Sequence, residues 1–334
     1  MPGDAIALDE RHFAPMRTQG SQTTPPPVTP DARMQEELAR RLATIEGIFD
    51  TGLLEGRGEK EAEVACYYEQ SRWAYKIFHS NEGAMHLALS PDGVFDKQGY
   101  LGQAREVERL IGPDTESVLE LATGNGFNLR YLAERHPHTS FTGLDLVATH
   151  VAAARAKADG LGNARFLEGD FHRLPFDAET FDVLFVVESL CHATDLDTAL
   201  QEAHRVLRPG GVFVVIDGWR TARFAELPAE ARRAATATEQ AMSVAQPLVI
   251  DDWLDAVAER GFEVVEERDL TQQVLPTVRR LERIARVVFG HPRATRAAQR
   301  VLPERFLMNG IAVYLMQLTL AGGVHTYRLV VLRR

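Results

Sequence analysis

Cysteine is scarce in this chain, and its scarcity excludes two ways of stabilising a fold. Only Cys66 and Cys191 occur among the 334 residues, and they lie far apart in the sequence. A disulfide framework or a clustered zinc site needs more cysteines at closer spacing. The cysteine content therefore predicts a cytoplasmic protein whose thiols stay reduced.

Long apolar runs and an excess of basic residues are also absent. No uninterrupted apolar stretch reaches the ~18 residues of a membrane-spanning helix, and the N-terminal "MPGDAIALDERHF" lacks the order of a signal peptide. The 37 basic residues face 47 acidic ones, which gives a net charge of −10. We therefore expect no stable membrane insertion and no nucleic-acid partner. A hydrophobic content of 45% is enough for a globular core.

The N-terminal part of the chain divides into two regions of different composition. The segment "GSQTTPPPVTP" has too little apolar content to order itself, so we predict a disordered tail over residues 1–30. Apolar residues then recur at helical spacing in "DARMQEELARRLATIEGIF" and "EKEAEVACYYEQSRWAYKIFH". These two stretches predict a helical N-terminal cap over residues 31–110.

Short apolar runs rich in β-branched residues follow the predicted cap. The runs "SVLELA", "SFTGLDL", "ARFLEGD", "FDVLFVVES" and "GVFVVID" are mostly separated by helical segments. This alternation is typical of a doubly wound, Rossmann-like parallel α/β sheet, whose core we place at residues 111–220. Within residues 221–334, "FEVVEERDL" and "VHTYRLVVLRR" would complete seven strands. Helical insertions at 222–243 and 275–321 predict a substrate lid.

A glycine turn follows the first predicted strand in "VLELATGNGFNLRYL". A strand, a turn containing Gly124 and Gly126, and a helix N-terminus would present backbone N–H groups to a ligand. The dinucleotide fingerprint is incomplete, because Leu129 occupies the place of the third glycine. A nicotinamide or flavin cofactor is therefore disfavoured, while an ordinary tight turn stays open as an alternative.

Acidic residues stand at the ends of three successive predicted strands. They are Glu120, Asp145 and Asp170, and Phe171 follows the last of them. In a parallel sheet these strand ends face one crevice, the usual ligand site of open α/β folds. Their positions suit a cationic amine, a ribose diol and an adenine edge beside an apolar ring, whereas a phosphate would be repelled. A ligand that combines these groups is S-adenosylmethionine.

Residues 117–220 resemble the core of the class I S-adenosylmethionine-dependent methyltransferases. The family's D/E-x-G-x-G-x-G turn is matched by "ELATGNG", except that Ala122 replaces the first glycine, and "DLVATHVAAARAKA", "GDFHRLPFDAETFDVLFVVESLCH" and "EAHRVLRPGGVFVVID" resemble its later motifs. The resemblance implies a small-molecule acceptor and S-adenosylmethionine as the methyl donor. It implies that the donor is held by Glu120, Ala122, Gly124, Gly126, Asp145, Leu146, Asp170, Phe171 and Glu188.

Two shorter stretches narrow the resemblance. "VVESLCHATD" and "YYEQSRW" are similar to stretches of the sterol C24-methyltransferases and of relatives that methylate isoprenoid carbons. This similarity places Glu188, Cys191 and His192 in the pocket, with Tyr67 and Tyr68 beside them. The residues that it implies as catalytic are Glu188, His192, Tyr67 and Tyr68.

Carbon methylation of an alkene passes through a carbocation, which requires π-faces, a carboxylate and then a base. Glu188 or His192 could be that base. The faces could come from Tyr67, Tyr68, Trp73, Tyr75 and Phe78. Three alternatives stay open: the aromatic residues belong to a core, the protein methylates oxygen or nitrogen with His192 as base, or it binds ligands without turnover.

An arginine-rich segment lies near the C-terminus of the chain. Between Leu270 and Phe306 there are eight arginines and two glutamates. Helical spacing places Arg279, Arg283 and Arg286 on one face, which suits either a solvated surface or an anionic acceptor such as a prenyl diphosphate. We expect no dedicated metal site, and Mg²⁺ only together with a diphosphate acceptor. A homo-oligomer is left open.

Overall fold

The computed structural model describes residues 30–49, 80, 82–298 and 304–334 of the chain. The predicted disordered tail, apart from Pro30, lies outside these residues, and so does the aromatic stretch from Tyr67 to Phe78. The expectations for Tyr67, Tyr68, Trp73, Tyr75 and Phe78 therefore stay predictions.

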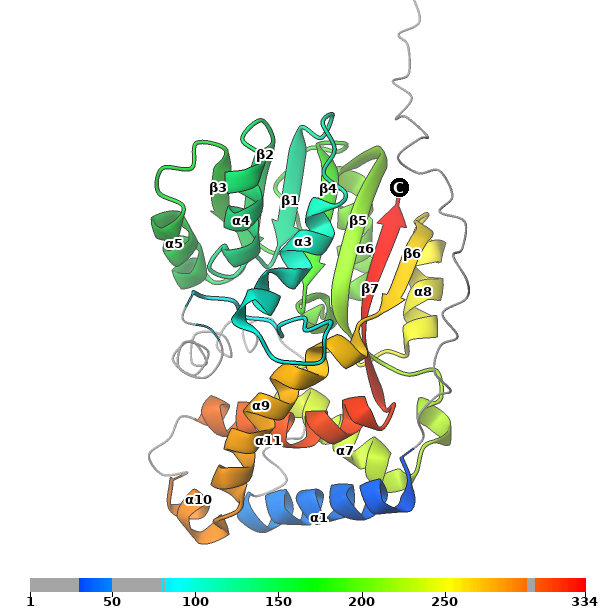
Figure 1. Cartoon of the computed structure of the whole chain (residues 1–334). Helices are drawn as coiled ribbons and strands as arrows, with labels where there is room; N and C mark the ends of the chain where they lie inside the picture. The colour runs from blue at the N-terminus through cyan, green and yellow to red at the C-terminus, as the bar shows by residue number, and fades with distance from the viewer. Residues whose placement is uncertain (1–29, 50–79, 81, 299–303) are drawn as a thin grey trace, which may run out of the picture.

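A seven-stranded sheet forms the centre of the molecule (Figure 1). The strands lie in the order β3-β2-β1-β4-β5-β7-β6. Their bounds are β1 Ser117–Leu121, β2 Ser140–Asp145, β3 Ala164–Glu168, β4 Phe181–Val187, β5 Leu207–Arg220, β6 Glu263–Asp269 and β7 His325–Arg333. The predicted seven-stranded α/β sheet is thereby confirmed.

The central strands are apolar on both faces, and β4 illustrates the reason. Val183 and Phe185 pack on one face of the sheet, while Leu184 and Val186 pack on the other. All four side chains are at most 1% exposed. A strand buried on both faces reads as a continuous apolar run. Burial of each such side chain contributes about 1.5–3 kcal/mol, which holds β4 at the centre of the sheet.

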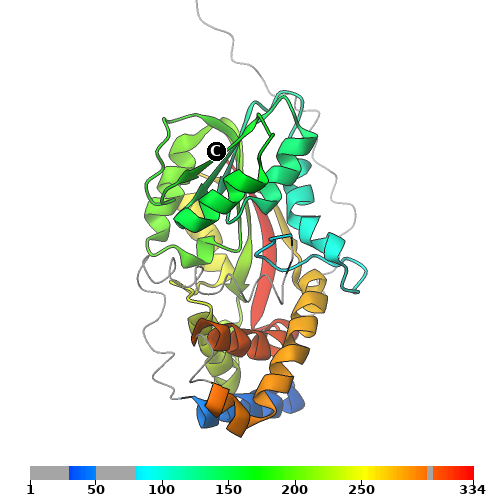
Figure 2. The ribbon, with the colours of Figure 1, turned by 90° about the vertical axis from the view of Figure 1, so that its left-hand side faces the viewer.

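Helices cover both faces of the sheet, which Figure 2 shows nearly edge-on. One face carries α3 (Gly102–Glu108), α4 (Phe127–Arg135) and α5 (Ala148–Lys157). The other carries α6 (Leu196–Val206) and α8 (Ile250–Glu259). Helix α3 therefore packs with the sheet, although its residues fall inside the segment that the sequence assigned to the N-terminal cap.

A separate set of helices lies across the carboxyl ends of the parallel strands (Figure 1). It has a buried apolar core of its own. We call it the helical layer, and its members are α1 Ala32–Ile48, α7 Ala229–Ala241, α9 Thr271–Phe289, α10 Pro292–Ala298 and α11 Glu304–Ala321. The helical insertions predicted at 222–243 and 275–321 supply all of it except α1. The described residues also form three short 3₁₀-helices: η3 Lys97–Leu101, which leads into α3, η4 Leu190–His192 and η5 Phe224–Glu226.

A buried ion pair joins α1 to the rest of the helical layer. Arg41 on α1 lies 2.8 Å from the carboxylate of Glu282 on α9, and its guanidinium stacks 4.7 Å from the ring centre of Tyr314 on α11. Both charged side chains are less than 10% exposed. Loss of one partner would leave the other charge buried, so this pair strongly restricts how α1 can sit.

The sheet is mixed rather than wholly parallel, which corrects the sequence expectation. β7 runs antiparallel to both of its neighbours, β5 and β6. The reason lies in the helical insertion between β6 and β7. That insertion leaves β6 and enters β7 at the same end of the two strands. The strand that follows it therefore runs in the opposite direction to the strand that precedes it (Figure 1).

Candidate active site

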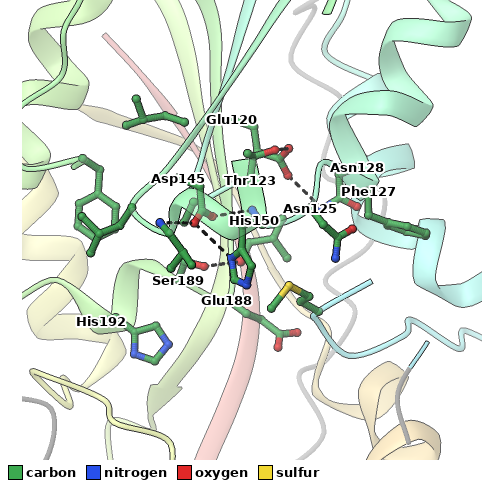
Figure 3. Close-up of a pocket in the computed structure, with 18 of the residues that line it drawn as sticks. Glu120, Thr123, Asn125, Phe127, Asn128, Asp145, His150, Glu188, Ser189 and His192 are labelled. Carbon is green, nitrogen blue, oxygen red and sulfur yellow. Dashed lines mark hydrogen bonds and ion pairs between the residues drawn. The ribbon is translucent and has the colours of Figure 1, made fainter. Parts of the chain in front are cut away.

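Three cavities in the described part of the chain share Glu188, which directly follows β4, in their lining. The first cavity lies over β1, β2 and β4 (Figure 3). Among the predicted site residues, it is lined by Glu120, Ala122, Gly124, Asp145, Leu146, Asp170, Phe171, Glu188 and His192. Chain segments distant in sequence thus meet in one place, as the strand ends of a parallel sheet require.

The loop between β1 and α4 is held in a left-handed backbone conformation. Gly124 and Gly126 have φ of +55° and +75°, and Ala122 has φ of +50°. Alanine rarely adopts this region, so Ala122 is strained where the related motif has glycine. Gly126 caps α4, and a Cβ there would lie 2.8 Å from the ring of Phe166. Gly126 therefore shapes the turn from behind the first cavity and does not line it.

Asp145 ends β2 and ties the glycine loop to it. One carboxylate oxygen accepts a hydrogen bond from the backbone N–H of Gly124 at 2.7 Å. The other accepts from the N–H of Val147 at 2.9 Å and lies 3.3 Å from Nδ1 of His150. Asp145 is only 6% exposed, yet its side chain borders the first cavity. These bonds fix the carboxylate beside the loop.

Glu120 is the penultimate residue of β1 and lies inside a small polar network (Figure 3). Its carboxylate accepts hydrogen bonds from Oγ1 of Thr123 at 2.5 Å and from the side-chain amide of Asn128 at 3.2 Å. The amide oxygen of Asn128 in turn lies 3.1 Å from Nε2 of His86. Burial raises the pKa of Glu120 to about 8, with a smaller contribution from Asp145. At neutral pH this carboxyl is therefore largely protonated.

Asp170 and Phe171 follow β3 at the other side of the first cavity. Asp170 accepts a hydrogen bond from the N–H of His172 at 2.8 Å, and the same oxygen lies 2.7 Å from Nδ1 of that ring. The rings of Phe171 and His172 are 4.7 Å apart between centroids. A carboxylate next to an apolar ring is the arrangement expected for an adenine edge.

Glu188 lies where all three cavities meet. It follows β4 directly, and its φ of +47° is strained for a residue with a side chain. Its carboxylate accepts hydrogen bonds from the N–H of Leu87 and from the hydroxyl of Tyr327, each at 2.8 Å. Burial, with a smaller contribution from the charge of Asp217, raises the pKa of Glu188 to about 7. Strain at this position directs the side chain into the shared space.

The second cavity lies between β5, β7 and α7 and has a volume of about 1130 Å³, its open mouth included. His192 borders both this cavity and the first one. Asp217 accepts hydrogen bonds from the N–H groups of Cys191 and Gly218, at 3.1 and 2.8 Å. Burial raises the pKa of Asp217 and of the Cys191 thiol, and it lowers the pKa of His192. The cavity thus favours the neutral forms of these groups.

Several lining residues were not predicted from the sequence. Glu239 of α7 accepts two hydrogen bonds from Arg220 at 2.8 and 2.6 Å, and it lies 3.0 Å from Nε2 of His325. These bonds hold the pKa of Glu239 down at about 2 against the opposing effect of its burial. Asp217, at the end of the run "GVFVVID", did carry a signal, because it ends a predicted strand as Asp145 does. No local pattern marks the partners of Glu239.

The third cavity is apolar and lies between α9 and α11. It has a volume of about 1050 Å³, its open mouth included. Val278, Leu281 and Ala285 line it from α9. The lining residues from α11 are Phe306, Leu307, Asn309, Gly310, Ala312, Val313 and Met316. Such a surface suits an elongated apolar molecule.

The three arginines predicted as anion ligands lie away from all three cavities. Arg279, Arg283 and Arg286 are exposed on α9, on the face opposite the third cavity. Arg286 also lies 3.8 Å from Glu282. None of the three arginines lines a cavity, because α9 contributes apolar residues to the third one, and their binding of an anionic acceptor stays a prediction. The alternative of a solvated surface agrees with their exposure.

Two features are absent from the described part of the chain. None of its helices is at once long and apolar enough to cross a lipid bilayer. Within residues 30–49, 80, 82–298 and 304–334, no group of three or more His, Cys, Asp or Glu side chains is arranged to hold a metal ion.

Comparison with protein-family models identifies a domain in this chain. Residues 119–215 match the model described as a methyltransferase domain. This segment contains most of β1, the glycine loop, β2 to β4 and most of β5, and hence the strand ends that border the first cavity.

Curated relatives are similar over a larger part of the chain. The sterol 24-C-methyltransferase of Kluyveromyces lactis is 30% identical over 165 residues, which are 47% of this chain and 43% of that protein. The sterol 24-C-methyltransferase erg-4 of Neurospora crassa is 31% identical over 236 residues, which are 67% of this chain and 61% of that protein. The chain thus spans between about two fifths and three fifths of the length of these relatives.

Solved structures share the fold. One is a geranyl diphosphate C-methyltransferase from Streptomyces coelicolor A3(2), in complex with Mg²⁺, geranyl diphosphate and S-adenosyl-L-homocysteine. The TM-score is 0.55 at 18% identity, and the match covers 80% of this chain and 97% of the other. At that identity the likeness extends to the architecture alone.

Proposed function

From the methyltransferase domain over residues 119–215, we propose that this chain is an S-adenosylmethionine-dependent methyltransferase. Its acceptor would be a carbon atom of an isoprenoid or of a similar apolar secondary metabolite. The observation that carries the proposal is the position of Glu188 at the meeting point of the three cavities. The first cavity would hold the methyl donor, and the second and third the acceptor.

The residues of the first cavity fit the methyl donor. Bare backbone at Gly124 allows a ligand to approach the loop closely, and Asp145 lies beside it to accept hydrogen bonds from ribose hydroxyls. Glu120 suits an amino group, while Asp170 and Phe171 suit an adenine ring. When bound, S-adenosylmethionine supplies an electrophilic methyl group next to a sulfonium.

The lining of the second and third cavities favours an uncharged acceptor over a diphosphate. Among the described residues that line them, Arg220 is the only lysine or arginine, and Glu239 pairs with it. Glu188 and Asp217 add carboxyl groups to the same space. An anionic acceptor would be repelled there, so we propose an apolar alcohol or hydrocarbon. Mg²⁺ would enter only with a diphosphate.

Two side chains have complementary roles in this proposal. Glu188, when ionised, would stabilise positive charge that develops on the acceptor carbon, because its carboxylate is held in place by Leu87 and Tyr327. His192 borders the donor cavity and the acceptor cavity, and burial keeps its ring neutral, so it would accept the proton that leaves the acceptor.

Experiments can distinguish two other candidate functions from carbon methylation. A neutral His192 could equally take the proton of a hydroxyl or an amine, which favours oxygen or nitrogen methylation of a small natural product as the second candidate. A protein that binds the donor without turnover is the third.

The test combines calorimetry and mass spectrometry on the full chain. We expect S-adenosylhomocysteine to bind, and S-adenosylmethionine with a labelled methyl group to yield a labelled product from a panel of prenols, prenyl diphosphates, sterols and phenols. A label that resists ether cleavage supports carbon methylation, whereas a cleavable label supports the second candidate. Donor binding without any product supports the third, and absence of binding would contradict all three.

Affinity for S-adenosylhomocysteine should rise with pH because of Glu120. The pKa of this buried carboxyl is raised to about 8, so it is protonated at pH 6 and cannot attract the ligand's ammonium group. As pH increases from 6 to 8, we expect the affinity to increase by at most about tenfold per pH unit. Calorimetry should show proton release on binding over this range.

The matched variants are Glu120→Gln and Glu134→Gln. Glu134 is exposed on α4 and borders none of the cavities, so its variant should keep the pH dependence. Glu120→Gln should bind weakly and with little dependence on pH. If the affinity of Glu120→Gln depended on pH as that of the wild type does, Glu120 would not be the residue that binds the ligand's amino group.

A further inference from the structure

We propose that the segment after α7 sets the tautomer of His192, with Ser243 as the positioning residue. The backbone carbonyl of Ser243 fixes the proton on Nδ1 of His192 and so makes Nε2 the nitrogen that accepts a proton. This inference deepens the proposed function, on which it rests, and it links the helical layer to the chemistry of the site.

Residues 243–246 hold the loop that carries His192 through three hydrogen bonds. Nδ1 of His192 lies 2.9 Å from the carbonyl oxygen of Ser243. The N–H of Ala245 donates to the carbonyl of Cys191 at 3.0 Å, and the side-chain amide of Gln246 donates to the carbonyl of Thr194 at 2.9 Å. We call these three bonds the clasp. They join two segments that lie about fifty residues apart in the sequence.

The chemistry of the carbonyl decides the protonation of the ring. A carbonyl oxygen can only accept a hydrogen bond, so Nδ1 must be the donor and must carry a proton. Burial disfavours the charged ring and lowers the pKa of His192. A neutral ring with its proton on Nδ1 has its basic lone pair on Nε2.

Ser243 is held in a conformation that few residues adopt. Its φ is +59°, and its side chain is fully buried. The turn is closed by the N–H of Ser243, which donates to the carbonyl of Gln240 at 3.1 Å, and by the N–H of Val244, which donates to Glu239 at 2.9 Å. A left-handed serine costs energy, and here that conformation directs the carbonyl toward the ring.

The tautomer of His192 matters because of where its ring lies. His192 borders both the first and the second cavity, so its ring lies between the proposed donor and the proposed acceptor. After carbon methylation, the C–H bond next to the cationic carbon breaks, its electron pair forms a C=C bond, and the proton moves to Nε2. A ring with its proton on Nε2 could not take part in this step.

The clasp makes the base depend on the helical layer. α7 ends at Ala241, two residues before Ser243, and it packs on α1 and α11 in the apolar core of that layer. Three carboxyl groups border the second cavity with His192, and Arg220 and His325 border it too. The carboxyl groups belong to Asp217, Glu188 and Glu239. Of these, Asp217 acts on His192 by raising its pKa against the effect of burial.

The test reads the tautomer directly by ¹⁵N NMR of histidine-labelled full-length protein with S-adenosylhomocysteine, with His192→Asn used to assign the signal. We expect the wild type to carry the proton on Nδ1. Ser243→Gly, which tolerates the left-handed backbone, should keep the tautomer and keep turnover within about twofold. Ser243→Val, which disfavours that backbone, should shift the tautomer and lower turnover at least about tenfold at unchanged donor affinity.

Gln246→Ala provides a second route if Ser243→Val does not fold. It removes one bond of the clasp at an exposed position, and we expect a detectable fraction of Nε2–H tautomer and about fivefold lower turnover. A proton on Nε2 in the wild type would overturn the proposal, and so would unchanged tautomer and turnover in both Ser243→Val and Gln246→Ala. Donor binding and methyl transfer are measured on the wild type. Failure of the proposed function can therefore be distinguished from failure of this inference.

Discussion

Replacing Glu188 by glutamine is expected to lower turnover at least about a hundredfold while S-adenosylhomocysteine affinity stays within about threefold. Glutamine has the same shape, and its amide oxygen can still accept the hydrogen bonds from Leu87 and Tyr327. Only the negative charge is lost, and loss of one preorganised electrostatic contact in a buried site costs about 10²–10³ in rate. Turnover at saturating donor and calorimetry with the product analogue measure the two quantities.

The pH profile identifies the charge that Glu188 supplies. Because its pKa is raised to about 7, its carboxylate is present above that pH and is lost by protonation below it. Wild-type turnover should therefore fall as pH decreases through about 7, and Glu188→Gln should lack this limb. Glu168→Gln is the matched control, since Glu168 also ends a strand but is exposed and borders no cavity. If Glu188→Gln and Glu168→Gln had equal turnover, Glu188 would have no role in the chemical step.

Replacing Asp145 by alanine should weaken S-adenosylhomocysteine binding between about tenfold and about a hundredfold. The carboxylate would accept hydrogen bonds from the ribose hydroxyls of the ligand, and it already holds the N–H groups of Gly124 and Val147. Each hydrogen bond to a charged group contributes about 1.5–3 kcal/mol, which sets the expected range. Calorimetry measures the affinity, and a thermal melt checks that the variant folds.

Asp159→Ala provides the control for that experiment. Asp159 follows α5 in the same strand–helix unit, but it is exposed and does not border the first cavity. Its variant should bind as tightly as the wild type. If Asp145→Ala also bound as tightly, Asp145 would not be the ribose ligand, and the proposed placement of the donor would have to change.

The sequence was most informative where local pattern and sheet geometry coincide. Apolar β-branched runs predicted all seven strands, and residues at strand ends, such as Glu120 and Asp145, were expected to meet because parallel strands end at one edge. Glu188 and His192 followed from a short resemblance just after β4. The direction of β7 escaped prediction, because it depends on where the helical insertion before it lies.

Hydrogen bonds between distant segments away from these strand ends could not be predicted. No sequence pattern near Glu239 predicts its contacts with Arg220 and His325. Likewise, no pattern near Ser243 predicts that its carbonyl accepts a hydrogen bond from His192. The arginines of α9 show another limit of prediction from the sequence. Helical spacing correctly placed Arg279, Arg283 and Arg286 on one face, but spacing alone does not say which face turns toward a cavity.

The antiparallel course of β7 has a consequence for how such a protein diversifies. β6 and β7 are hydrogen-bonded neighbours, so the 55 residues from Leu270 to Val324 leave the sheet and return to it at adjacent points. A tight hairpin could close the same gap. Changes in the length or the apolar lining of this insertion would therefore alter the third cavity, while the strand order and the loop between β1 and α4 would stay the same. Under the proposed function, such changes would alter the choice of acceptor and leave the site of the methyl donor as it is.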